Sequence, residues 1–439
     1  MKMEQSGTKL KKELGLLASI TIVIGMVIGS GIFFKPAIVF KNAGSPTMGI
    51  MAWVIGGLIT VASGLTIAEI AVAIPKTGGV FIYLKELYGE KWAFLFGWVQ
   101  TVVYVPGSIA AQAIILATQL TSFIELNHTQ QQLLAIFFLF FIAAMNIIST
   151  KLGGKIQVVA TIAKLVPIAV IIVLGFMNGT AKGILLNTGG QSAFKGLGAA
   201  ILGTLWAYDG WVSIGNMAGE LKNPKKDLPR SIILGLFLVI VVYTLINIAL
   251  IKIMPVEAII NSNKPASDAA TVLFGSVGAK FISAGIAISI FGALNGYMMT
   301  GVRIPFAMAQ DKQLPFSDAL GSVNKKLQTP INSFILVVVL ASLYVLSGSF
   351  NTLTDLVMFI LWIFFTMAIA GIFILRKKFK HIKTSYRVPL YPIVPLIGII
   401  GSIYIIISTL ITNISYAVFG TVITLLGLPV YYYLKNKKN

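Results

Sequence analysis

The sequence predicts an all-α polytopic membrane protein with twelve transmembrane helices, and three observations lead to this fold class. Hydrophobic residues make up 57% of the 439 residues and charged residues only 11%, whereas a soluble domain has about a quarter of its residues charged. The mean hydropathy of the chain is +0.90. Apolar runs long enough to cross a bilayer follow one another along the chain, and basic residues collect in alternate connections between them.

The number of spans follows from the length of these runs, because a bilayer-crossing helix needs about 20 mostly apolar residues. We expect spans at approximately 17–40, 47–73, 92–121, 131–149, 156–177, 195–219, 231–254, 277–309, 331–347, 352–375, 393–411 and 415–434. No long polar segment interrupts them. Residues 1–439 are therefore expected to form a single transmembrane domain.

The distribution of Lys and Arg predicts the orientation of the chain. The N-terminal side of the membrane collects 26 of the 34 basic residues, and the opposite side collects seven, among them Lys35. Both termini are therefore expected in the cytoplasm, with the protein in the cell membrane. The net charge of +20 then reflects membrane topology rather than binding to nucleic acid.

The first span carries a glycine-rich interruption. The stretch "VIGMVIGSGIFFKPA" places Gly29, Ser30 and Gly31 near the middle of residues 17–40, and two glycines around a serine weaken a helix. Gly25 and Gly29 also form a GxxxG pattern, so close helix packing is an alternative explanation. Non-helical backbone inside a membrane occurs only where protein or a water-filled cavity covers it.

The sixth span carries a second interruption, "WAYDGW", with Asp209 next to a glycine at mid-span. The interrupted spans are the first and the sixth, and each begins a block of five. Such a pair favours a transporter built from inverted repeats, here at about 17–177 and 195–375, with the helices at about 393–434 outside them. This five-plus-five arrangement is inferred from layout alone.

A broken helix can bind both ends of an amino acid. Free N–H groups where the second half begins attract a carboxylate, helped by the helix dipole, and free C=O groups where the first half ends attract an ammonium group. The two breaks together therefore suit a zwitterion. Neighbouring side chains such as Trp206 would set the side-chain preference.

Four charged residues within the spans require explanation, because charge in a membrane is costly. Lys164 lies about 13 Å into the fifth span at 1.5 Å per residue, which favours a buried functional ammonium over a snorkelling lysine; we expect it against free carbonyls of the broken first helix. Glu69 and Arg303 are expected in structural roles near the cytoplasmic side. Asp209 either accepts a hydrogen bond in the break or pairs with a cation there.

Several classes of function are excluded by composition. There is no cysteine, and the two histidines, His128 and His381, lie in hydrophilic stretches. The lack of cysteine rules out a thiolate metal site, and two separate histidines rule out a histidine metal cluster. No nucleophile–base set suggests an enzyme, and no metal or cofactor is expected. A channel would show a polar filter, and the sequence has none.

A set of motifs in order along the chain resembles one known family. They are "IGSGIF", "LTIAEIAVAIPKTGG", "AKLVP", "WAYDGW", "FGALNG" and "AQDKQLP". Together they resemble the L-type amino acid transporter family of the amino acid–polyamine–organocation superfamily, over essentially the whole chain. The resemblance is strongest to bacterial members that exchange small neutral amino acids such as serine and threonine. It implies twelve spans, the inverted repeat and alternating access.

The resemblance also implies roles for particular residues. The substrate carboxylate would meet the backbone N–H groups of Gly29, Ser30 and Gly31, and the amino group would meet carbonyls of Val27, Trp206 and Asp209. Trp206 would close over the substrate. Lys164 would occupy the place of sodium in distant relatives, which implies independence from sodium.

Two departures from the family matter. Animal members have glycine where this chain has Asp209, which puts their preference for large neutral substrates in doubt here. Animal members also join a glycoprotein subunit through a cysteine between spans 3 and 4. Here that loop reads "TSFIELNHTQQ" and the chain has no cysteine, so a disulfide-linked heavy chain is excluded.

The leading hypothesis is therefore a sodium-independent exchanger of small to medium neutral L-amino acids. The alternative is a proton-coupled amino acid symporter, in which deprotonation of Lys164 would supply the coupling, since burial can lower the pKa of a lysine.

Overall fold

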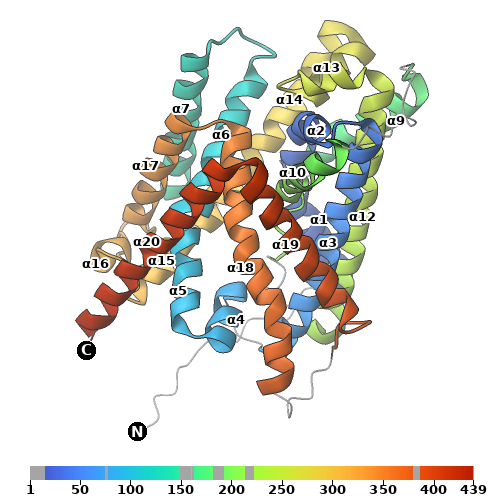
Figure 1. Cartoon of the computed structure of the whole chain (residues 1–439). Helices are drawn as coiled ribbons and strands as arrows, with labels where there is room; N and C mark the ends of the chain where they lie inside the picture. The colour runs from blue at the N-terminus through green and yellow to red at the C-terminus, as the bar shows by residue number, and fades with distance from the viewer. Residues whose placement is uncertain are drawn as a thin grey trace.

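The computed structural model describes residues 15–74, 78–148, 160, 163–180, 192–212, 222–378 and 386–438. Within these ranges the regular secondary structure is helical, and the helices form one bundle (Figure 1). The N-terminal residues 1–14, expected as a cytoplasmic tail, and the end of the sixth expected span lie outside the described residues.

The helices follow the expected spans closely. Their bounds are α1 Leu16–Val27, α2 Gly31–Ala43, α3 Pro46–Ala73, α4 Gly79–Tyr88, α5 Glu90–Val99, the π-helix η1 Gln100–Tyr104, α6 Val105–Leu120, α7 His128–Ile148, α9 Leu165–Asn178, α10 Ser192–Ala207, α12 Pro224–Ile253, α13 Val256–Ile260, α14 Pro265–Gly301, α15 Arg303–Gln310, α16 Ser317–Leu320, α17 Ile331–Ser347, α18 Phe350–Lys378, α19 Ile393–Thr412 and α20 Ile414–Lys438.

Eight helices in the described part are long and apolar enough to cross a membrane, and a ninth span is formed if the bent pair α1 and α2 counts as one. The remaining three expected spans coincide with shorter apolar helices, at Leu165–Asn178, Gly196–Ala207 and Ile331–Ser347. The chain is thus a multi-pass helical membrane protein, and the count of twelve stays a prediction. The eighth expected span, 277–309, agrees with the part of α14 that follows a kink at Gly275 together with α15; a further helical segment from Pro265 precedes the kink.

Local sequence explains where α3 begins. At the start of α3 the Ser45 side chain accepts a hydrogen bond from the Met48 N–H at 3.2 Å, and Pro46 occupies the first turn, where its missing N–H has no helical partner anyway.

Between α5 and α6 the helix continues through η1. A π-helical turn of this kind shifts the following side chains around the helix and is frequent at functional sites.

Among the described membrane-length helices, the continuous helix from α5 through η1 to α6 is the most buried, followed by α3 and α18. α10 packs against α2 and α3, and α12 packs against α1 and α3; Figure 1 shows α18 running through the bundle with α19 and α20 along its flank. Small residues permit these close contacts: a Cβ at Gly56 would lie 2.2 Å from the Thr204 hydroxyl of α10. By contrast, only 17% of the 18-residue apolar stretch of α20 is buried. α20 is therefore peripheral, as expected for a helix facing lipid.

Candidate functional site

The first interruption is a real break in the helix. α1 ends at Val27, α2 begins at Gly31, and the two axes differ by 53°. The Ser30 hydroxyl is buried and has no hydrogen-bond partner among the described residues. Among the described residues there is room beside Gly29, since a Cβ added there would meet only the Val27 carbonyl oxygen, at 3.9 Å. Close packing by the described helices therefore does not account for Gly29.

The second interruption lies at the end of α10. The helix stops at Ala207 and the chain turns through residues 208–212. Gly210 has φ of +103°, a conformation that glycine adopts without the penalty a Cβ brings. A Cβ there would also lie 2.7 Å from the Met26 carbonyl oxygen of α1. Both constraints require glycine after Asp209.

The two breaks touch each other. A Cβ at Gly31 would lie 2.7 Å from the Cα and Cβ of Ala207, so the start of α2 approaches the end of α10 as closely as backbones allow. The Tyr243 hydroxyl of α12 lies 3.1 Å from the Val27 carbonyl oxygen and 2.8 Å from that of Ala207. One hydroxyl from a third helix therefore bridges the carboxyl ends of both interrupted helices.

Lys164 lies at the first break, as the sequence predicts. It directly precedes α9, is buried, and its ammonium donates hydrogen bonds to the carbonyl oxygens of Gly25 and Ile28. These are carbonyls at the end of α1, where the helix dipole favours positive charge. The expected contact is present; a role for Lys164 in transport remains a prediction.

Asp209 is held by two tyrosines. Its Oδ2 accepts hydrogen bonds from the hydroxyls of Tyr104 at 2.7 Å and Tyr297 at 3.2 Å. The sequence left open whether Asp209 accepts a hydrogen bond or pairs with a cation, and its described contacts are hydrogen bonds. Neither tyrosine was predicted as a site residue. The available signal was a lone tyrosine within each of two apolar spans, and Tyr104 owes its position to η1, which sequence does not reveal.

Trp206 belongs to a chain of aromatic rings beside the second break. Its indole stacks on Tyr297 with ring centroids 6.3 Å apart and 5° between planes, and it meets Phe350 edge to face at 6.1 Å. Phe350 in turn contacts Phe34 of α2 at 6.1 Å, and Tyr297 contacts Tyr104 at 6.4 Å. This aromatic chain joins α2, α18, α10, α14 and η1, and a covering role for Trp206 stays a prediction.

Sequence analysis missed the burial of Lys35. It was counted only among the basic residues of the side opposite the N-terminus, but the structure buries it completely within α2. Its ammonium lies 2.8 Å from Asp355 of α18 and 5.3 Å from the centre of the Phe350 ring. Lys35 lies inside the expected span 17–40, so it belonged with the charged residues within the spans. An acid inside the span expected at 352–375 was the overlooked signal, since buried charges need partners.

Glu69 forms the structural ion pair that was predicted. The Arg376 guanidinium binds both carboxylate oxygens, at 3.0 and 2.8 Å, and the Val388 N–H donates to Oε2 at 2.6 Å. Beside it, outside the membrane-spanning segments, burial raises the pKa of Tyr386, and the Glu69 carboxylate adds to the effect. The pair therefore fastens α3, α18 and the segment before α19 together. Arg303 donates to the Met299 carbonyl one turn earlier and is exposed.

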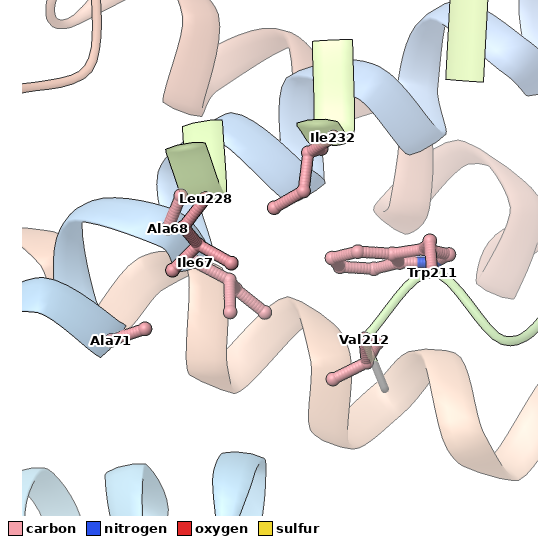
Figure 2. Close-up of a pocket in the computed structure, with 7 residues that line it drawn as sticks. All are labelled: Ile67, Ala68, Ala71, Trp211, Val212, Leu228 and Ile232. Carbon is pink, nitrogen blue, oxygen red and sulfur yellow. The ribbon is translucent and has the colours of Figure 1, made fainter. Parts of the chain in front are cut away.

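A small apolar pocket lies beside the turn that follows α10. Figure 2 shows the Trp211 ring on one side of it and Ile67, Ala68 and Leu228 on the other. Its lining residues come from α3, the turn after α10 and α12: Ile67, Ala68, Ala71, Trp211, Val212, Leu228 and Ile232. None of these described residues is charged, so they offer nothing to orient a zwitterion.

Within the described ranges no three His, Cys, Asp or Glu residues come together as metal ligands.

The chain is similar to known transport proteins along its full length. Residues 14–429 match the family model described as "Amino acid permease". The serine/threonine exchanger SteT of Bacillus subtilis (strain 168) is 44% identical over 439 residues, covering 100% of both chains. The mouse b(0,+)-type amino acid transporter 1 is 31% identical over 98% of this chain and 89% of its own. The human large neutral amino acids transporter small subunit 2 is 31% identical, over 97% and 81% respectively.

Proposed function

This chain belongs to the amino acid permease family, and we therefore propose that it is an amino acid exchanger working by alternating access. The name of the Bacillus relative, a serine/threonine exchanger similar over the whole length, supports exchange of small neutral L-amino acids. It also favours exchange over the proton-coupled symporter considered as the alternative.

The observation that carries the proposed site is the meeting of two broken helices. The N-terminal end of α2, with Gly29, Ser30 and Gly31, is the proposed seat of the substrate carboxylate, since free N–H groups and the helix dipole attract an anion. Among the described residues, the unpartnered Ser30 hydroxyl and the room beside Gly29 support this assignment.

The amino group is assigned to the carboxyl ends of the interrupted helices. Backbone carbonyls of Val27, Trp206 and Asp209 are its proposed acceptors. The Val27 carbonyl oxygen is 3.1 Å from the Tyr243 hydroxyl and the Trp206 carbonyl accepts the Asp209 N–H at 3.3 Å. A carbonyl oxygen has two lone pairs, so these contacts leave room for an ammonium donor. Trp206 is proposed to cover the substrate.

Independence from sodium is proposed from the position of Lys164. Its ammonium occupies the carbonyl oxygens of Gly25 and Ile28, which are oxygen ligands that a small cation would otherwise use. A fixed positive charge there opposes binding of a second cation.

The wider architecture is proposed along with the function. We assign twelve spans arranged as inverted repeats at about 17–177 and 195–375, followed by two helices at about 393–434. Both termini are assigned to the cytoplasm of the cell from the basic residues. A disulfide-linked heavy chain has no cysteine to attach to.

Exchange is tested in liposomes that contain the purified protein and radiolabelled serine. Serine added outside, in sodium-free buffer, is expected to accelerate release of the label several-fold over release into serine-free buffer. Equal release into both buffers would refute exchange. Uptake into empty vesicles driven by an imposed pH gradient would instead support the symporter, and competition by a panel of amino acids would define the substrate range.

A further inference from the structure

Three acidic side chains are buried in the described part of the chain, and they differ in their partners. Glu69 pairs with Arg376 and Asp355 pairs with Lys35. Asp209 is equally buried, at 7% exposed, but the donors to its carboxylate are uncharged groups, the hydroxyls of Tyr104 and Tyr297 and the backbone N–H of Gly210. Among the described residues no Lys or Arg forms an ion pair with Asp209.

A buried carboxylate without a cation is unfavourable. Removing a charge from water has a large desolvation penalty, which a pair of opposite charge or several hydrogen bonds must offset. Two tyrosine hydroxyls and one backbone N–H, all uncharged, offset part of it. The ammonium of Lys164 donates to other groups, the carbonyl oxygens of Gly25 and Ile28 at the first break.

The backbone on either side of Asp209 contacts the first break. Two residues before it, Ala207 packs against Gly31 at the start of α2, and one residue after it, Gly210 packs against Met26 near the end of α1. The turn that carries Asp209 is therefore in contact with both halves of the broken first span. The proposed carboxylate seat lies in one of these halves.

We infer that the Asp209 side chain is the counter-ion of the substrate α-ammonium, and that this pairing makes reorientation of the carrier depend on bound substrate. The inference rests on the proposed function and deepens it. An ammonium has three donors, so it can bond the Asp209 carboxylate and backbone carbonyls together. The zwitterion then supplies positive charge at Asp209 and negative charge at the N-terminus of α2.

This arrangement provides a physical reason for exchange. In the empty carrier the Asp209 charge is uncompensated, so a closed empty state that shuts the carboxylate away from water is raised in free energy. Bound substrate lowers the free energy of the closed state through the ion pair. A ligand shifts a conformational equilibrium only by its differential affinity for the two states, and here that difference resides in one charge.

The tyrosines suggest a competing role. In that role the tyrosine hydroxyls and the carboxylate hydrogen-bond the side-chain hydroxyl of serine. Asp209 would then select among substrates without pairing with the ammonium. Comparison of serine with alanine separates the two roles, since these amino acids share the ammonium and differ in the hydroxyl.

The test is Asp209→Asn, which keeps the size of the side chain and removes its charge. Binding of serine and of alanine to purified protein is measured by isothermal calorimetry or by ligand-induced thermal stabilisation. Both affinities are expected to fall by about 10- to 100-fold, the range for a hydrogen bond to a charged group, with the serine-to-alanine ratio unchanged within about threefold. A loss confined to serine, or no loss for either, would overturn the inference.

Transport supplies the second readout. In liposomes, Asp209→Asn is expected to release labelled serine into serine-free buffer nearly as fast as into serine-containing buffer, because the empty carrier no longer bears a bare charge. Retention of the wild-type dependence on external serine counts against the inference. Asp318→Asn makes the same chemical change at an exposed carboxylate on α16 and is expected to match the wild type.

Two further measurements keep the inference separate from other failures. If Asp209→Asn does not fold, Tyr104→Phe is used, because it leaves the charge of Asp209 in place. The ratio of serine affinity to alanine affinity is then expected to stay the same. A fall in that ratio would favour recognition of the serine hydroxyl and overturn the inference. If the wild type shows no serine-stimulated release, the proposed exchange fails, whereas the binding comparison still decides the role of Asp209.

Discussion

At the first helix break the Ser30 hydroxyl is buried without a hydrogen-bond partner among the described residues, while Gly31 packs against Ala207. At the second, the Gly210 backbone packs against Met26, and Asp209 and Trp206 contact tyrosine side chains. The two interruptions look alike in sequence, yet within the described residues only the first contains a buried side-chain polar atom without a partner. This difference favours the first break as the proposed seat of a ligand and the second as the packed support that carries Asp209.

The largest effect is expected from Lys164→Ala, which removes the charge that satisfies the first break. Two carbonyl oxygens lose their donor, but the desolvation penalty of the buried ammonium disappears as well, so the two effects on folding free energy oppose each other. Serine exchange is expected to fall about 100-fold while thermal unfolding changes little. Lys280→Ala, at an exposed lysine of α14, is the control. Wild-type exchange in Lys164→Ala would show that this ammonium has no role in transport.

Ser30→Leu is expected to have the next largest effect, because it fills the proposed carboxylate seat. Serine binding should weaken at least about tenfold, since a buried small-to-large change forces neighbours aside at a cost of about 1–3 kcal/mol. Ser30→Ala removes only the hydroxyl and should bind serine within about threefold of the wild type. Undiminished binding by Ser30→Leu would remove the first break from the binding site.

Gly210→Ala tests the tight packing of the second break. The φ of +103° and the Met26 carbonyl oxygen 2.7 Å from the new Cβ are expected to lower the free energy of unfolding by about 2 kcal/mol. Gly29→Ala, at the first break, where the described residues leave room for a Cβ, should change it by less than about 1 kcal/mol. The measurement is denaturant unfolding in detergent. Equal losses in the two variants would contradict the difference between the breaks.

The smallest effect is expected from Tyr243→Phe, which removes the hydroxyl shared by both breaks. A net loss of about 1 kcal/mol is typical for one neutral hydrogen bond, so exchange should slow a few-fold. Tyr344→Phe deletes a similar bond, to the Val102 carbonyl at 2.9 Å, outside the breaks. If both variants slow exchange equally, the bridge between the breaks has no special importance.

Much of the fold could be predicted from the sequence because the bilayer imposes simple requirements. Apolar length located the spans, and glycine beside polar residues located both interruptions. The burial of Lys164 at the first break followed from its depth in the fifth span. These features depend on local sequence and on the solvent around the helices.

Other features depend on contacts between distant parts of the chain, and these were missed. Lys35 meets a carboxylate 320 residues away, so its burial is invisible to a count of loop charges. Tyr104 reaches Asp209 only because η1 rotates it into place, and Tyr297 arrives from α14. Pairings of this kind are fixed by the packing of whole helices rather than by any short motif.

One consequence of the two buried ion pairs concerns α18. It bears Asp355, joined to Lys35 of α2, and Arg376, joined to Glu69 of α3. At 1.5 Å per residue these positions lie about 31 Å apart, close to the roughly 30 Å thickness of the hydrocarbon core. The helix α18 is therefore held by one ion pair near each of its ends. A tilt of α18 that moves one end must either break the ion pair at that end or move α2 or α3 together with α18.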